Sequence, residues 1–281
     1  MSVLKRAAVV GLGGQAQDDH LPGLADCQFA ELVAVCDTDP DRAAAQGRAY
    51  RVPGYTDLTT LLKEVRPDFV IAAVPHHAGR EVIEACAAAG VHVMKEKPFA
   101  THPAEGAELA GLCATAGIEL MVTVQRRFHP IYTAALQLLE QIGPPYLVEG
   151  RYTFHCADPA AGWRGSAKLA GGGALVDMGY HLIDLLIWYL GLPDRVLADT
   201  SAAAAPGAAP ATPAPSPPPN EPRAAPGPRH PPPAVASRFM NRFNCHSRVS
   251  PRRDHATIGS SRERVDSPPC WKRCFAEPPS R

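Results

Sequence analysis

The chain has 281 residues and a balanced charge, with 28 Lys and Arg against 28 Asp and Glu, so we expect one or two domains and no nucleic-acid partner. No apolar stretch reaches the roughly 20 residues that span a bilayer, and the apolar segment after Met1 is too short for a secretory signal, so we expect a soluble, cytoplasmic protein without a membrane partner. The balance covers two unlike parts, because residues 1–200 carry a net charge of −7, whereas residues 201–281 carry +7 and 18 of the 30 prolines.

Apolar, β-branched segments alternate with helical patterns over residues 1–125. Strands are expected at 7–10, 32–36, 69–74, 91–94 and 118–124, and helices at 16–24, 41–49, 57–65, 80–89 and 103–116. Asp39 before Pro40 is typical of an N-cap followed by a first helical proline, and Thr56 is expected to cap the next helix. Because strands that alternate with helices indicate parallel βαβ units, we predict an α/β fold with a doubly wound parallel sheet.

A glycine-rich turn follows the first expected strand. It consists of Gly11, Leu12, Gly13, Gly14, Gln15 and Ala16. Gly11 permits the tight turn, Gly13 lets a pyrophosphate approach the backbone, and Ala16 allows close packing of helix and strand. Asp37 ends the second strand, where a carboxylate can bind both ribose hydroxyls and repel a 2′-phosphate. The pattern predicts dinucleotide binding with NAD favoured over NADP, although Arg42 nearby makes that preference less marked.

Charged residues follow the strand expected at 91–94. Glu96, Lys97 and Pro98 would lie at the carboxyl end of a parallel strand, on the cofactor side of the sheet; a solvated loop is the alternative. Farther along, a helix is expected at 174–190 after a glycine-rich stretch at 166–173 that is not expected to be helical. On this helix Asp177 and His181 are four residues apart and share a face, either as a structural pair or as catalytic groups.

These landmarks together resemble the Gfo/Idh/MocA family, which is called after glucose–fructose oxidoreductase, inositol dehydrogenase and rhizopine catabolism. The resemblance covers residues 6–195 and rests, in family order, on residues 11–16, His20-Leu21-Pro22, Asp37, Val74-Pro75, Glu96-Lys97-Pro98, Gln125-Arg126-Arg127-Phe128, Trp163-Arg164 and Asp177-Met178-Gly179-Tyr180-His181. It implies a Rossmann domain, a C-terminal α+β domain and NAD(P)-dependent oxidation or reduction of a sugar, polyol or related substrate. It also implies homo-oligomers formed through the C-terminal sheet. We do not expect such oligomers here, because the later strands of that sheet are absent from this sequence.

The resemblance also implies roles for individual residues. Lys97, Asp177 and His181 match the catalytic residues: His181 takes the hydroxyl proton, Asp177 orients His181, and Lys97 stabilises the developing alkoxide. Substrate contacts are implied for Trp163, Arg164, His181 and Arg127, with a structural ion pair as an equal alternative for Arg127. Cofactor contacts are implied for Gly11, Gly13, Gly14, Gln15, Ala16, Asp37, Val74, Pro75, His77, Glu96, Lys97 and Gln125. No metal is expected, because the spacing of His76, His77 and His155 fits no ligand set.

The composition changes after residue 200. Residues 201–233 hold 13 prolines and no Val, Leu or Ile, so residues 201–281 are expected to be disordered. We therefore expect a dinucleotide-binding domain at 1–125, a partial substrate domain at 126–200 that begins with a strand at 146–155, and a tail at 201–281. A frameshift in a GC-rich gene is the preferred explanation of the tail, and a natural Pro-rich linker with a basic end is the alternative.

Three functions fit this organisation. The first is an NAD-dependent oxidoreductase, the second is a cofactor-binding protein without turnover, and the third is an NAD-using glycoside hydrolase of the same family. The helix at 174–190 is apolar nearly all round and needs a covering surface that residues 201–281 cannot supply. We therefore expect a stable N-terminal domain, a weakly held segment at 145–195 and little turnover.

Overall fold

The computed structural model describes residues 4–143, 145–152, 158 and 161–198. Those up to Gly191 belong to one compact unit, and residues 192–198 belong to a second. The expectations for residues 153–157 and 201–281 lie outside the described residues.

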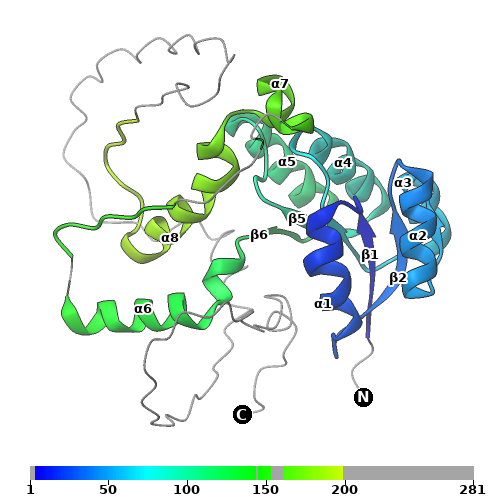
Figure 1. Ribbon diagram of the computed structural model, residues 1–281, viewed down its shortest axis with the longest axis horizontal. Coiled ribbons are helices and arrows are strands. Elements are labelled where there is room, and N and C mark those ends of the chain that lie inside the picture. Colours follow the sequence, from blue (N-terminus) through cyan, green and yellow to red (C-terminus); the bar gives the residue numbers. More distant parts are fainter. Residues whose placement is uncertain (1–3, 144, 153–157, 159–160, 199–281) are drawn as a thin grey trace. The chain divides into compact units, whose positions relative to one another are not determined.

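One parallel sheet of six strands organises residues 5–123 (Figure 1). Its order is β3-β2-β1-β4-β5-β6, which is the Rossmann order, so the prediction of a doubly wound α/β fold is confirmed. The strands are β1 (Lys5–Val10), β2 (Ala30–Cys36), β3 (Gly54–Tyr55), β4 (Phe69–Ala72), β5 (His92–Glu96) and β6 (Leu120–Thr123). Because every strand pair is parallel, the carboxyl ends of all six strands lie along the same edge.

Helical segments connect the strands and continue beyond the sheet. Up to β6 they are η1 (Ala16–His20), α1 (Leu21–Ala25), α2 (Pro40–Tyr50), α3 (Leu58–Val65), η2 (His76–Ala78), α4 (Gly79–Ala89) and α5 (Pro103–Ala116). After β6 they are η3 (Gln125–Phe128), α6 (Pro130–Ile142), η4 (Gly162–Gly165), α7 (Ala167–Ala170), η5 (Leu175–Gly179) and α8 (Tyr180–Leu190). As predicted, the Asp39 carboxylate caps α2, and Gly90 and Gly117 end α4 and α5 in the left-handed conformation.

Two hydrophobic clusters cover the two faces of the sheet. Alternate residues of β1 point to opposite faces, so Ala8 and Val10 pack with α3, α4 and α5, whereas Ala7 and Val9 pack with η1 and α1. Beyond residue 125 the buried hydrophobic side chains of the described chain are only Ala170 and Leu185. The Rossmann part therefore has its own core.

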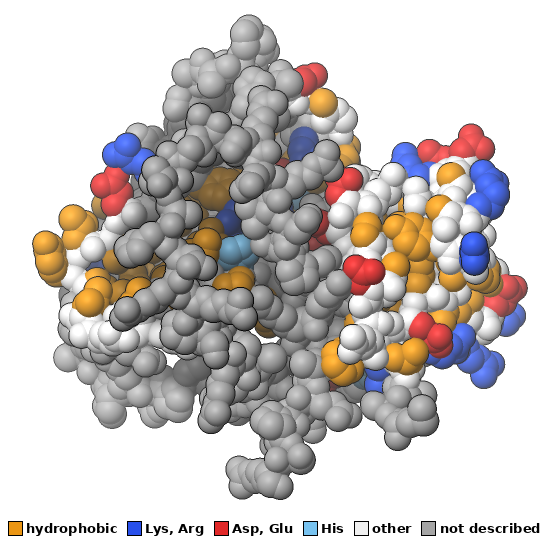
Figure 2. Space-filling view, turned by 60° about the horizontal axis from the view of Figure 1, so that its bottom comes forward, with side chains coloured by type: hydrophobic (Ala, Val, Ile, Leu, Met, Phe, Trp, Pro, Cys, Tyr) orange, Lys and Arg blue, Asp and Glu red, His pale blue; other side chains and the backbone are white. Residues whose placement is uncertain are grey.

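Large apolar side chains are exposed on the helices that follow the sheet. On α6 they are Ile131, Leu138 and Ile142, with exposed fractions of 69%, 58% and 73%. On η5 and α8 they are Leu175, Ile183 and Leu190, each about half exposed. Figure 2 shows hydrophobic side chains at the surface of one face of the molecule. The segment at 174–190, expected to be apolar nearly all round, therefore carries large apolar side chains that are about half exposed.

Three expectations about local structure were wrong, and two elements were not anticipated. Asp57, not Thr56, caps α3, because its carboxylate accepts hydrogen bonds from both the backbone and the side chain of Thr60. Residues 146–152 form no strand, since no other described strand pairs with them. One helical turn, α7, forms within 166–173, where the glycines cluster only after Ala170. The two-residue strand β3 and the helix α6 were not anticipated.

Candidate active site

The glycine-rich turn joins β1 to the first helix. Gly11 has a φ of +83°, and a Cβ atom there would lie 2.6 Å from the carbonyl oxygen of Ala73. Gly13 borders open space, since a Cβ there would have no heavy atom within 4 Å. The helix begins at Gly14, with a π-helical turn from Ala16 to His20. The turn therefore keeps free backbone and open space at a helix N-terminus, the arrangement that binds a pyrophosphate.

Asp37 lies just past the carboxyl end of β2 and is 7% exposed. Its carboxylate accepts hydrogen bonds from the backbone nitrogens of Leu12 (2.7 Å) and Asp39 (2.9 Å). The Arg42 guanidinium lies 3.2 Å from the same carboxylate and 3.1 Å from that of Asp39. Asp37 thus holds the glycine-rich turn through the backbone of Leu12. Its ion pair with Arg42 also places the Arg42 guanidinium beside the expected ribose site.

Lys97 follows β5 and forms the centre of a charged cluster. Its Nζ donates to the backbone oxygen of Asp177 (2.8 Å) and to the Asp177 carboxylate (3.0 Å). Arg164 Nε donates to the other carboxylate oxygen of Asp177 at 3.0 Å. Burial alone would raise the pKa of Asp177, but the hydrogen bonds from Arg164 and Lys97 outweigh it and hold that pKa below its usual value. Two residues predicted as catalytic and one predicted substrate residue therefore meet in one place.

His76, rather than His77, belongs to this cluster. His76 is buried in η2 and His77 is exposed. The Nδ1 atom of His76 lies 2.8 Å from the Ala170 carbonyl oxygen and must donate to it, which leaves the Nε2 lone pair 3.8 Å from the Asp177 carboxylate. The Trp163 ring meets His76 edge to face at 4.5 Å. The position of His76 could have been predicted from the sequence, because this residue follows the buried strand β4, at the edge of the sheet where the cofactor is expected.

His181 is 4% exposed, and its Nδ1 atom has no hydrogen-bond partner among the described residues. Burial, followed by the positive charges of Lys97 and Arg126, lowers its pKa to about 4, so the imidazole is neutral at pH 7. The expectation that Asp177 orients His181 was wrong, because the hydrogen bonds of Asp177 go to Lys97 and Arg164. The physical reason is that these two cations occupy both oxygens of the Asp177 carboxylate.

Glu96 connects the end of β5 with the helix that follows the glycine-rich turn. Its carboxylate lies 2.9 Å from Nε2 of His20, and both residues are buried. Burial raises the pKa of Glu96, but hydrogen bonds from His20 and Thr123 bring it below its usual value. Because His20 belongs to the π-helical turn η1, this buried pair ties the helix after the glycine-rich turn to the residue next to Lys97.

Arg127 forms an ion pair with Asp184. The guanidinium donates twice to the carboxylate, from Nε at 2.8 Å and from a terminal nitrogen at 2.6 Å, and both side chains are about 15% exposed. This contact joins η3 to α8. It corresponds to the structural ion pair that was the alternative to substrate binding for Arg127. Its neighbour Arg126, not predicted to have a role, donates to the hydroxyls of Tyr132 and Tyr152.

The residues present fit a dinucleotide cofactor. Gly13 leaves the backbone of the turn open, and Oε1 of Gln125 is buried without a hydrogen-bond partner in the described part of the chain, as expected of an acceptor kept for a ligand. Val74 lies beside the turn, because its side chain would be 2.9 Å from a Cβ on Gly11, and Pro75 follows it in the sequence. Gln15 donates to Asp19 within the first helix.

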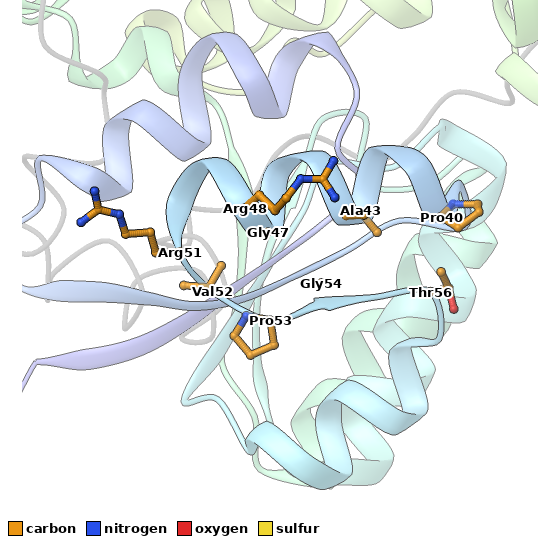
Figure 3. A pocket seen from close by; sticks show the side chains of 10 residues that line it. Pro40, Ala43, Gly47, Arg48, Arg51, Val52, Pro53, Gly54 and Thr56 are labelled. Atoms are coloured by element: carbon orange, nitrogen blue, oxygen red, sulfur yellow. The ribbon is translucent and has the colours of Figure 1, made fainter.

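One further depression lies on the described surface, away from the Lys97–Asp177 pair. This depression between α2 and β3 (Figure 3) is lined by Arg48 and Arg51 as its only ionisable side chains. Within the described residues, no group of three or more His, Cys, Asp or Glu side chains could hold a metal ion, and His155 lies outside them. No helix in the same part of the chain is long and apolar enough to span a membrane.

Comparison with known proteins gives matches along most of the described chain. A model named "Oxidoreductase family, NAD-binding Rossmann fold" matches residues 5–124, and one for the GFO/IDH/MocA C-terminal domain matches residues 132–217. D-Glucoside 3-dehydrogenase from Escherichia coli is 31% identical over 194 residues, which are 67% of this chain and 54% of that protein.

Two solved structures are similar over 67% of this chain. Aldose-aldose oxidoreductase from Caulobacter crescentus, complexed with glycerol, gives a TM-score of 0.61 at 29% identity and is covered over 58% of its length. The WlbA dehydrogenase from Bordetella pertussis, in complex with NADH and UDP-GlcNAcA, gives 0.59 at 28% identity and is covered over 60%. The chain therefore spans little more than half the length of these relatives.

Proposed function

Since the chain belongs to the Gfo/Idh/MocA family of oxidoreductases, we propose that it transfers hydride between NAD and a hydroxyl or carbonyl group of a sugar or polyol. The observation that carries the proposal is the Lys97–Asp177 pair, which stands at the carboxyl end of β5 and is linked through Glu96 and His20 to the helix of the glycine-rich turn. The sugar class is supported by the relatives, which are a glucoside dehydrogenase and an aldose oxidoreductase.

The proposed roles follow from charge and protonation. A bound nicotinamide would supply the hydride acceptor. Lys97 would donate a hydrogen bond to the substrate oxygen and stabilise negative charge on it. Asp177 would hold the Lys97 ammonium in place, and His181, which is neutral at pH 7, would accept the hydroxyl proton. Trp163 and Arg164 would cover the substrate side of the Lys97–Asp177 pair, because both contact members of that cluster.

We propose NAD rather than NADP as the cofactor. The Asp37 carboxylate is buried beside the turn, where it would repel a 2′-phosphate. Arg42 offsets part of this repulsion, because its guanidinium is already paired with Asp37 and Asp39. Substitution of Asp37 by Arg removes the repelling charge and adds a second cation, so Asp37→Arg should move the preference from NADH toward NADPH in a fluorescence titration.

A cofactor-binding protein without turnover is the second candidate. The exposed apolar residues of α6 and α8 favour it, because a helix that carries His181 and is only partly covered holds its catalytic groups less firmly. An NAD-using glycoside hydrolase remains the third. Both alternatives keep the dinucleotide site, so NADH binding alone separates neither from the dehydrogenase.

The test uses the full chain, NADH fluorescence and a panel of glucosides, aldoses and polyols followed by absorbance at the NADH band. A dehydrogenase binds NADH and reduces NAD with at least one compound of the panel, and Lys97→Met abolishes the reduction while leaving NADH binding in place. Release of sugar from a glucoside without net NADH formation would identify the hydrolase. NADH binding with neither reaction would identify the cofactor-binding protein, and a folded chain that binds no NADH would refute the proposal.

A further inference from the structure

Lys95 is the most deeply buried charged side chain of the sheet, with 1% of its surface exposed. Its Nζ donates to the backbone oxygens of Glu96 (2.8 Å) and Pro98 (3.0 Å). These two carbonyl groups lie on either side of Lys97 along the chain. A buried ammonium is costly unless it is hydrogen-bonded, and here the two bonds go to the backbone that carries the proposed catalytic lysine.

The space for Lys95 comes from a glycine on α4. A Cβ atom on Gly79 would lie 2.3 Å from Cε and 3.1 Å from Nζ of Lys95, which is closer than non-bonded atoms approach. Gly79 has no positive φ, so an alanine there would be acceptable to the backbone and would conflict only with the Lys95 side chain. The two residues therefore fit together as a pair.

The side chains of β5 alternate between the two faces of the sheet, and this alternation shows how Lys95 and Gly79 support the end of the strand. Val93 and Lys95 point toward α4, whereas Met94 and Glu96 point to the opposite face, where Glu96 pairs with His20. The backbone nitrogen of Lys97 donates to Thr123 of β6 at 3.3 Å. The end of β5 is thus held from both faces of the sheet and from the neighbouring strand.

We infer that Lys95 is a positioning residue, which fixes the backbone on both sides of Lys97, and that Gly79 is the residue that makes room for it. The inference rests on the proposed function only in giving Lys97 its chemical role. Lys95 itself is enclosed below the site and acts through the two carbonyl groups.

The first experiment measures the reactivity of Lys97 in the full chain. Succinimidyl acetate is added to the wild type and to Lys95→Met, and acetylation of each lysine is quantified by peptide mass spectrometry. Loss of hydrogen bonds from a buried cation favours local opening on the order of tenfold, so Lys97 should be acetylated faster by a similar factor. The exposed Lys5 and Lys168 should react at unchanged rates, and Lys63→Met, at an exposed position of α3, should change nothing.

The second experiment is a double-mutant cycle. Gly79→Ala should raise the acetylation of Lys97 as Lys95→Met does, and the double variant should show a smaller rise than the sum of the two, because the hydrogen bonds that Gly79→Ala breaks are already absent in Lys95→Met. Gly111→Ala is the matched control, since Gly111 lies within α5 with nothing within 4 Å of an added Cβ. If Lys95→Met fails to fold, the acetylation of Lys97 in Gly79→Ala, compared with Gly111→Ala, decides whether the inference holds.

Several results would overturn the inference. One is an unchanged Lys97 rate in folded Gly79→Ala and Lys95→Met, and another is an equal rise at Lys5, Lys97 and Lys168, which indicates general destabilisation. Full additivity of the two substitutions would be the third. A wild type that binds no NADH would refute the proposed function and would leave the acetylation comparison valid.

Discussion

Removal of one partner of the Arg127–Asp184 pair should release α8 while leaving the Rossmann part folded. Exposed ion pairs contribute about 0–1 kcal/mol, and removal of one partner from a buried pair costs about 3–5 kcal/mol. Because both side chains are about 15% exposed and the contact is bidentate, we expect Asp184→Asn to lower the free energy of unfolding of this segment by about 2–4 kcal/mol.

The three tryptophans make this loss measurable. Trp163, Trp188 and Trp271 all follow the sheet in the sequence, so residues 1–125 contain no tryptophan. Trp188 lies on α8 with the Arg127 guanidinium 5.7 Å from its ring, whereas Trp163 contacts His76, so the change at Trp188 is the one that reports on the ion pair. In a urea titration Asp184→Asn should shift the fluorescence transition to lower urea, whereas the circular dichroism of the Rossmann helices and strands should keep its transition. Glu149→Gln is the control, because its pair with Arg151 is largely exposed and should contribute less than about 0.5 kcal/mol.

The double variant completes the test. Arg127→Gln combined with Asp184→Asn leaves two neutral amides, so it should cost less than the sum of the two single substitutions. If Asp184→Asn leaves the fluorescence transition where it is, or moves both transitions together, the ion pair does not hold α8 as argued.

Three further predictions concern the cofactor turn, the buried imidazole and the thiols. Gly13→Ala should leave the melting temperature unchanged but weaken NADH binding at least tenfold by fluorescence, because its Cβ would enter only the open space of the turn. Because the pKa of His181 is lowered, the unfolded chain takes up a proton on this imidazole at about pH 6.5, whereas the folded chain does so only near pH 4. The free energy of unfolding should therefore fall as the pH is lowered from 6.5 to 4. In urea titrations over this pH range, His181→Gln should make the fall smaller. Burial raises the pKa of the Cys86 thiol to about 12, so iodoacetamide should alkylate the half-buried Cys27 well before Cys86, and equal rates by mass spectrometry would contradict this.

The sequence determined the Rossmann half of this protein almost completely. Alternation of β-branched runs with capped helices predicted five of the six strands and the order of the helices, because each of those elements carries its own local signal. β3 was missed, since two residues show no alternation, and α6 was not predicted from its sequence. The glycine-rich turn was equally predictable, because a positive φ at Gly11 and an open backbone at Gly13 are properties of single residues.

Only the tertiary structure decided which side chains meet. Spacing on a helix paired Asp177 with His181, but two cations from distant parts of the chain, Lys97 and Arg164, bind the Asp177 carboxylate instead. The sequence analysis gave Lys95 no role, and its burial became evident only in the structure, where Gly79 of α4 leaves room for its side chain. Such contacts join residues far apart in the sequence, so no local pattern encodes them. Local patterns fix elements and turns, whereas the packing of one element against another fixes the partners of each charge.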